Sequence, residues 1–136
     1  MNLTGKWKGY FRYGREYGPM GGETEYFEID LIDDQGSLLG RALDKDDIGL
    51  IASISGFHED GFISFVKKYD KHLEFNEDYT QTIIYDKPFE VEYTGNYFLE
   101  DKKFYGQWEI TYHESKILQP SKDFVYSGVW GMEKIV

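Results

Sequence analysis

Hydrophobic and polar residues alternate along almost the whole chain. Over residues 3–13 the odd positions carry apolar residues or glycine, and the even positions carry mostly charged or polar residues. Residues 24–33, 90–100 and 104–113 show the same alternation. Successive side chains of a β-strand point to opposite faces, so a period of two is typical of strands with one buried face. No stretch sustains the helical spacing, and the sequence predicts an all-β fold.

Short turn sequences separate these segments. Residues 33–36, 58–61 and 100–103 are typical of hairpin turns, and residues 44–49 form a further acidic turn. Connections this short favour strands that pair with their neighbours in sequence, and no helix is predicted that would cover an open sheet. We therefore expect a single domain over residues 1–136, an up-and-down antiparallel β-barrel of about eight strands. A two-sheet sandwich is the alternative.

The expected strands can be delimited by their turns. They cover residues 3–13, 24–33, 37–44, 50–57, 62–69, 90–100, 104–113 and a last strand that includes Phe124 and Met132. Residues 62–69 are too uniformly apolar for the buried face to be assigned. Residues 70–89 are irregular, and we interpret them as a long excursion with room for a short strand of its own.

A glycine precedes an aromatic residue by two positions at four places on these strands. The pairs are Gly5 with Trp7, Gly95 with Tyr97, Gly106 with Trp108, and Gly128 with Trp130. Glycine weakens a strand, so its repeated use at inward positions indicates either a tight bend or space for a neighbouring ring. A barrel of this size is either filled by side chains or holds one small molecule, and the spacing leaves both interpretations open.

These motifs resemble those of the calycin barrels, which include lipocalins, fatty-acid-binding proteins and avidins. Gly5-Lys6-Trp7 is similar to the Gly-x-Trp start of that group, and the later order of motifs at residues 93–97 and 106–110 resembles avidin and streptavidin. The resemblance implies a calycin-like barrel that binds a small molecule in its interior. Biotin is not implied, because the residues after Trp7 lack the Asn and Ser of a biotin site. The lipocalin disulfides and the helical lid of the fatty-acid binders are also missing.

Inward aromatic residues are the candidate ligand-binding site. They are Trp7, Phe27, Tyr93, Tyr97, Trp108, Tyr112 and Trp130. Buried indole N–H and phenol O–H groups need partners, which a ligand or water would supply, or which the rings and the backbone supply themselves. We expect non-catalytic binding of a small hydrophobic or amphipathic molecule.

A packed barrel that acts through its outer face is the alternative function. Outward rings such as Tyr10, Tyr26, Phe98 and Tyr105 would then mediate contacts in a homo-oligomer or with a protein partner. An enzyme that uses the barrel mouth is a third interpretation, because a fold does not fix a function. The sequence offers no catalytic group for it, so we do not expect an enzyme.

Charge and composition narrow the partners. With 25 acidic and 15 basic residues, the formal net charge is −10, which disfavours binding to nucleic acid or to anionic membranes. The chain has no cysteine, which excludes disulfides, thiolate zinc sites and a cysteine nucleophile. The first residues lack a basic segment followed by an apolar run, and we expect a soluble cytoplasmic protein.

Other candidate chemistry is weaker. Residues 44–49 resemble the start of an EF-hand loop, but its twelfth position is Ser55, so a solvated acidic turn is favoured over calcium. His58, His72 and His113 lack metal-ligand spacing, and we interpret them as surface residues. We expect neither a metal nor a cofactor.

Overall fold

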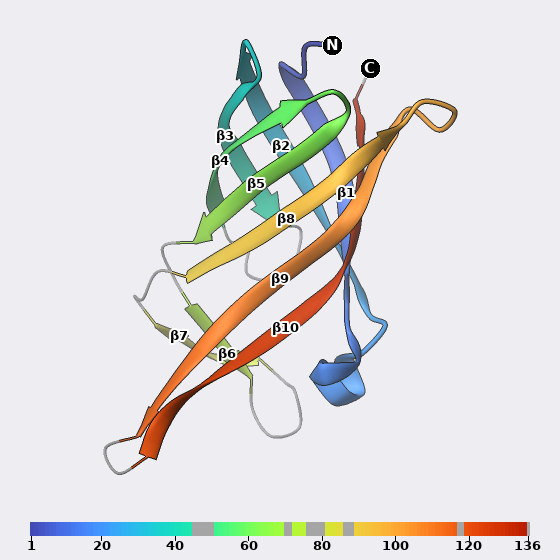
Figure 1. Ribbon diagram of the computed structural model, residues 1–136. Coiled ribbons are helices and arrows are strands. Elements are labelled where there is room, and N and C mark those ends of the chain that lie inside the picture. Colours follow the sequence, from blue (N-terminus) through green and yellow to red (C-terminus); the bar gives the residue numbers. More distant parts are fainter. Residues whose placement is uncertain (45–50, 70–71, 76–80, 86–88, 117–118, 136) are drawn as a thin grey trace.

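The computed structural model describes residues 1–44, 51–69, 72–75, 81–85, 89–116 and 119–135 (Figure 1). The strands are β1 (Gly5–Tyr13), β2 (Thr24–Asp34), β3 (Ser37–Asp44), β4 (Ile51–Glu59), β5 (Phe62–Tyr69), β6 (His72–Phe75), β7 (Gln81–Tyr85), β8 (Phe89–Phe98), β9 (Lys103–Lys116) and β10 (Gln119–Lys134). A 3₁₀ segment, η1 (Arg15–Met20), lies between β1 and β2.

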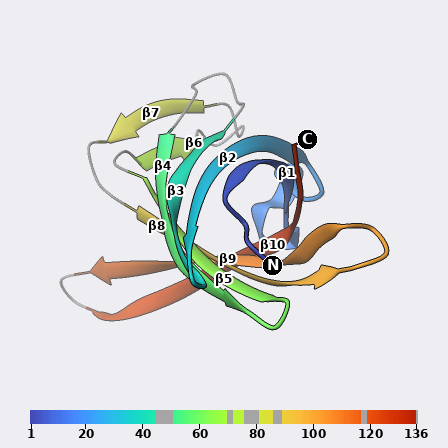
Figure 2. The same ribbon diagram turned by 90° about the horizontal axis from the view of Figure 1, so that it is seen from above.

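Eight strands close into an antiparallel barrel in the order β1-β10-β9-β8-β5-β4-β3-β2. The strands follow one another around the ring in chain order, and the pairing of β1 with β10 closes it. Figure 2 shows the ring from above, and Figure 1 shows that both termini lie at the same end. The predicted all-β, up-and-down barrel is confirmed. Closure pairs both edge strands, which removes the exposed edges that a sandwich or an open sheet would keep.

The excursion between β5 and β8 carries two strands. In the described part of residues 70–89, β6 and β7 pair antiparallel as a separate two-stranded sheet. Because this sheet stands outside the barrel, β5 pairs directly with β8 across the excursion. Neighbouring strands of the barrel therefore stay paired all the way round, although the chain leaves the barrel between β5 and β8.

Side chains alternate between the core and the outer face as the sequence predicts. On β2, Phe27, Ile29 and Leu31 are buried, whereas Ile32 is 65% exposed. On β3, Leu38 and Ala42 are buried, so the even-numbered residues 38–42 of this strand face the core. The core is one cluster, contributed by all eight barrel strands and by Leu3.

Two sequence expectations on orientation are corrected. Within the predicted strand 90–100, the alternation places Leu99 on the inward face with Tyr93 and Tyr97, but it is 78% exposed, because β8 ends at Phe98 and Leu99 begins the turn to β9. His58, expected in a surface turn, lies within β4, which continues to Glu59, and its side chain is only 11% exposed. Each strand end is shifted by one or two residues relative to the turn signals, and these shifts change the environment of the residue concerned.

Candidate functional site

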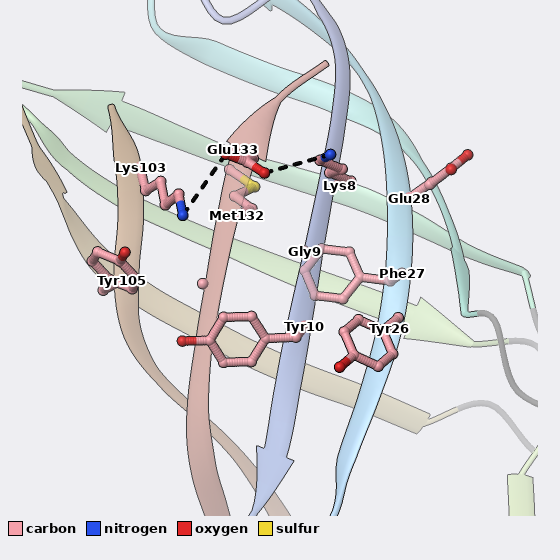
Figure 3. A pocket seen from close by; sticks show the side chains of 11 residues that line it. Lys8, Gly9, Tyr10, Tyr26, Phe27, Glu28, Lys103, Tyr105, Met132 and Glu133 are labelled. Carbon is pink, nitrogen blue, oxygen red and sulfur yellow. Dashed lines mark ion pairs between the residues drawn. The ribbon is translucent and has the colours of Figure 1, made fainter. Parts of the chain in front are cut away.

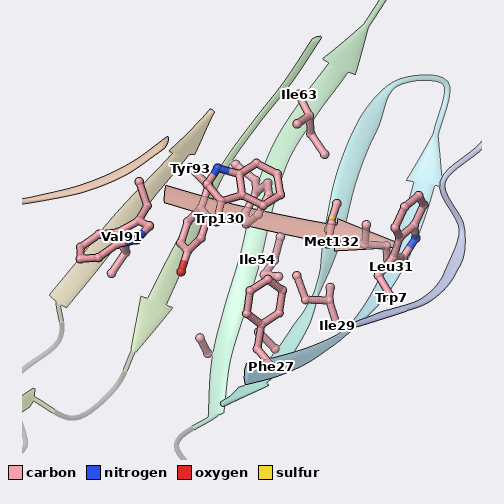
Figure 4. Packing of buried hydrophobic residues seen from close by; sticks show 14 of the residues in the cluster. Trp7, Phe27, Ile29, Leu31, Ile54, Ile63, Val91, Tyr93, Trp130 and Met132 are labelled. Carbon is pink, nitrogen blue, oxygen red and sulfur yellow. The ribbon is translucent and has the colours of Figure 1, made fainter. Parts of the chain in front are cut away.

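Aromatic rings from different strands fill the centre of the barrel. Phe65 on β5 and Tyr93 on β8 stack, with ring centroids 4.9 Å apart and planes 8° apart. The indole of Trp130 on β10 meets both rings edge-on, at 5.4 Å from Phe65 and 5.5 Å from Tyr93. Figure 4 shows Tyr93 and Trp130 side by side. Stacked and edge-to-face pairs at these separations are favourable, so this group forms a well-packed centre.

Glycines and tryptophans of β9 and β10 face one another reciprocally. Trp130 lies opposite Gly106, and Trp108 lies opposite Gly128. A Cβ atom built on Gly128 would lie 2.5 Å from Nε1 of Trp108, and one built on Gly95 would lie 2.9 Å from Cζ2 of Trp130. The indoles therefore occupy the space that glycine leaves. At these positions the Gly-x-ring spacing reflects interior packing.

The three indole N–H groups donate to backbone carbonyl oxygens. Nε1 of Trp7 donates to the carbonyl of Leu3 at 2.9 Å. Nε1 of Trp108 donates to a carbonyl of β1 at 3.2 Å, and Nε1 of Trp130 is shared between carbonyls of β8 and β9, each at 3.0 Å. Of the two sources of partners that the sequence left open, the backbone serves the indoles. The indoles of Trp108 and Trp130 thereby connect strands that are not adjacent in the barrel, β9 with β1 and β10 with β8, whereas that of Trp7 holds the segment before β1.

Most of the predicted ligand-binding residues come together in this core. Five of them expose no more than 2% of their surface: Trp7, Phe27, Tyr93, Trp108 and Trp130. Tyr97 is half-buried and meets Phe104 at 5.0 Å near the end that holds the termini. The side chain of Tyr112 lies outside the described residues. The inward position of the described set is confirmed, and ligand binding by it stays a prediction.

A lysine stands among these rings. Lys67 on β5 is completely buried. Its Nζ lies 3.8 Å from the ring centroid of Phe27, 4.6 Å from that of Tyr93 and 5.3 Å from that of Phe11. An ammonium this close to aromatic faces is stabilised by their quadrupoles, the more so where water is excluded.

Sequence reasoning missed Lys67. The apolar run over residues 62–69 hid the buried face of the strand. Once the strand is paired, its inward residues are Ile63, Phe65, Lys67 and Tyr69. The period-two alternation was therefore present in this strand, and Lys67 shares a face with three large apolar residues. A lysine at such a position is the sequence signal that could have identified it as inward.

The interior is less tightly closed at the end away from the termini. Phe11 and Tyr13 on β1 are half-buried there, and Phe11 lies opposite the half-buried Glu25 of β2. The rings of Phe11 and Tyr13 meet Trp108 edge-on, with centroids 6.0 Å and 6.1 Å away. Because Nζ of Lys67 approaches Phe11 as well as the central rings, the lysine stands where the packed centre meets this half-buried end.

At the other end, a buried carboxylate holds the N-terminal segment against the barrel. Asp33 accepts hydrogen bonds from the backbone N–H of Leu3 at 2.8 Å and of Gly36 at 2.9 Å. Its Oδ2 also lies 2.6 Å from Nε2 of His58. Burial raises the pKa of Asp33, but the two amide hydrogen bonds and the imidazole outweigh it, so the pKa of this carboxyl lies below its usual value. These contacts fix the N-terminal segment against β2 and β4 at the end of the barrel that holds the termini.

Three tyrosines surround a hollow on the outer face. Tyr26 on β2, Tyr10 on β1 and Tyr105 on β9 line a space of about 580 Å³ (Figure 3). Partial burial raises the pKa of Tyr105, and so does the carboxylate of Asp101, which accepts its phenol hydrogen bond at 3.3 Å. The phenol therefore stays neutral at physiological pH. Phe98 on β8 meets Tyr105 edge-on at 5.3 Å, so the four outward rings named from the sequence follow the outside of the barrel from β2 to β8.

Neither a metal-ligand cluster nor a membrane-spanning helix occurs in the described part of the chain. Among these residues, no group of three or more His, Asp or Glu side chains is placed to hold a metal ion. The acidic turn weighed as a calcium loop lies outside them at residues 45–50, as does the side chain of Asp44. No helix in the described ranges is long and apolar enough to cross a membrane.

The chain was compared with known protein families, with curated proteins and with solved structures, and nothing matches it in any of the three comparisons.

Proposed function

We propose that this barrel binds a small amphipathic molecule with an anionic group, without catalysing a reaction. The observation that carries the proposal is Lys67, a fully buried lysine whose Nζ lies among the rings of Phe11, Phe27 and Tyr93. A cation inside an aromatic barrel is a recognition group for a carboxylate or a similar anion.

The energetic argument starts from the cost of the charge. Transfer of an ammonium from water into a protein interior costs several kcal/mol, which the surroundings must offset. Ring faces at 3.8 to 5.3 Å offset part of it. An apolar side chain would fill the same place in a purely structural core without this cost. Lys67 also has a further interaction within the protein, so its position beside the half-buried Phe11, and not a lack of partners, favours a role in binding.

The packing restricts where a ligand is accommodated. Trp7 and Trp130 are enclosed, and their indole N–H groups donate to the backbone, so neither indole offers its N–H to a ligand. The half-buried Phe11 and Tyr13 remain next to the lysine. We place the anionic group near Nζ of Lys67 and the apolar part against these two rings, at the end away from the termini.

The resemblance to calycin barrels agrees with this proposal. The Gly-x-Trp motif of Gly5 and Trp7 opens β1, the first strand of a closed eight-stranded meander, as it does in lipocalins and avidins. Members of that group hold small molecules inside the barrel, and the proposal extends that use to this chain. The chemistry of the ligand is argued from Lys67 and not from the resemblance.

Removal of the interior charge tests the proposal. In Lys67→Met we expect the anionic probe anilinonaphthalene sulfonate to bind about tenfold to a hundredfold more weakly, because a hydrogen bond to a charged group contributes about 1.5–3 kcal/mol. The neutral probe N-phenyl-naphthylamine should keep its affinity. Tryptophan quenching reports both titrations, and Lys67→Arg, which keeps the charge, should retain the preference for the anion.

Lys68→Met is the matched control. Lys68 is the next residue on β5, exposed and outward, so the same substitution removes the same charge without reaching the interior. Near-UV circular dichroism of the tryptophans establishes that each variant is folded. Equal loss of both probes in Lys67→Met, or an equal effect of Lys68→Met, would contradict the proposed site.

A further inference from the structure

We propose that the outer face formed by β2, β1, β10 and β9 is an interface between two copies of this chain, related by a two-fold axis that runs along the strands between β1 and β10. Two rows of side chains across this face carry the inference. One row is charged, and the other is aromatic (Figure 3).

The charged row alternates in sign from strand to strand. Glu28 on β2 lies opposite Lys8 on β1, Lys8 lies opposite Glu133 on β10, and Glu133 lies opposite Lys103 on β9. Within one copy, Glu133 pairs with Lys8 at 3.5 Å and with Lys103 at 3.8 Å. The side chains of Lys8, Glu133 and Lys103 remain 59%, 41% and 39% exposed, so they are available to a partner.

A two-fold axis along the strands reverses the order of this row in the second copy. Lys8 then faces Glu133 of the second copy, and Glu28 faces Lys103 of the second copy. Each of the four facing pairs joins opposite charges, which is the complementarity that an isologous interface requires. The barrel is convex, so the central strands β1 and β10 meet first, and the Lys8–Glu133 pairs lie next to the axis.

The aromatic row obeys the same symmetry. Tyr26, Tyr10, Gly131 and Tyr105 lie opposite one another on β2, β1, β10 and β9. Reversal of this order places Tyr10 against Gly131 of the second copy, a ring against the one position in the row without a side chain. The rings of Tyr26 and Tyr105 then face each other, and the hollow of about 580 Å³ that these tyrosines line gives them room.

Net charge also favours this face. Each copy carries a formal charge of −10, so two copies repel each other at long range. Two lysines and two glutamates make the charged row neutral. Because rings and balanced charges concentrate here, this is a face on which two acidic molecules approach without local repulsion.

Charge exchange tests the symmetry itself. Lys8→Glu and Glu133→Lys each place two pairs of like charges across the axis, so each variant alone should dimerise about tenfold more weakly or worse. An equimolar mixture should form a heterodimer, because the glutamate introduced into β1 of one copy then faces the lysine introduced into β10 of the other, and all four pairs are opposite again. The double variant Lys8→Glu/Glu133→Lys should dimerise alone. Sedimentation velocity at physiological salt measures each mixture against the wild type.

Lys68→Glu is the control, since it makes the same charge change on the outer face of β5. It should sediment as the wild type does. A wild-type protein that stays monomeric at millimolar concentration would overturn the proposal. So would a dimer that survives Lys8→Glu, which would place the contact elsewhere, for example at the exposed Ile32 and Leu39. Loss of dimer in both single variants without rescue in the mixture would overturn the facing pairs.

Discussion

Asp33 shows how one residue orders one end of the barrel. Its carboxylate joins three parts of the chain: the N-terminal segment through Leu3, the turn after β2 through Gly36, and β4 through His58. Thr4 also binds Asp33: its hydroxyl oxygen accepts a hydrogen bond from the Asp33 backbone N–H at 3.0 Å. Leu3 is fully buried and belongs to the hydrophobic core at this end of the barrel. The carboxylate is therefore expected to stabilise the fold rather than to take part in binding.

We predict that Asp33→Asn lowers the free energy of unfolding by about 1–3 kcal/mol at neutral pH, because the buried amides then lose a charged acceptor. The pKa of Asp33 is lower in the folded state than its ordinary value of 3.8. Its stabilisation is therefore fully present above pH 3.8 and is lost as the pH falls through the folded pKa.

Urea unfolding at a series of pH values measures this effect. The difference between wild type and Asp33→Asn should be largest well above pH 3.8 and should shrink toward zero in acid. Asp34→Asn, at the exposed neighbouring position, should leave stability unchanged at neutral pH. A difference that grows on acidification would refute the assigned role of the carboxylate.

The same local view explains why Lys67 carries the functional argument. Its neighbours on the inward face of β5, Phe65 and Tyr69, are aromatic, and its Nζ lies over further rings from β1, β2 and β8. Its sequence signal, a lysine in step with Ile63, Phe65 and Tyr69, was hidden by the apolar run over residues 62–69. Only the pairing of β5 with β4 and β8 shows which way it faces.

At the scale of strands, the hairpin of β9 and β10 determines how the core is built. Its register sets Trp108 against Gly128 and Trp130 against Gly106. The sequence predicts that glycines make room for rings, because the spacing repeats. It does not predict which glycine receives which ring, since that depends on the register of the hairpin.

We predict that Gly128→Ala destabilises the protein by about 1–3 kcal/mol or more, the usual cost of overpacking a core. The added Cβ would lie 1.9 Å from the backbone oxygen of Arg12 and 2.5 Å from Nε1 of Trp108, so both β1 and the indole would have to shift. Thermal unfolding followed by tryptophan fluorescence measures the loss. Val129→Ala, at the exposed next position, should change stability by no more than about 0.5 kcal/mol. Equal effects of the two substitutions would disprove the packing role of Gly128.

The hairpin turns also mark what sequence patterns determine at this scale. Short turns between alternating segments predicted a meander of about eight strands, and eight strands form the barrel. The contact between Asp33 and His58 could not be predicted, because the two residues lie on separate strands and the turn signal at 58–61 placed the histidine outside β4. The row of outward tyrosines was predicted residue by residue, but only cross-strand register shows that Tyr10 and Tyr105 flank Gly131.

The whole molecule separates its two proposed activities in space. The interior holds Lys67, the residue proposed to recognise an anion, and the outer face of β2, β1, β10 and β9 holds the charged and aromatic rows. Phe27 and Met132 reach both, because they belong to the core and also line the outer hollow. Because Lys8 and Glu133 are exposed on the outer face and Lys67 is fully buried, substitution of Lys8 or Glu133 should change assembly without changing the interior, and substitution of Lys67 should do the reverse.

Native mass spectrometry of the protein, purified gently from cells and then incubated with dodecanoic acid, tests whether Lys67 makes the barrel interior a binding site for an amphipathic acid. We predict one bound acid per chain, retained in Lys68→Met and lost in Lys67→Met while the variant keeps its folded charge-state distribution. A wild-type protein that binds no acid even at a large excess, or a Lys67→Met variant that binds it as well as the wild type, would contradict it.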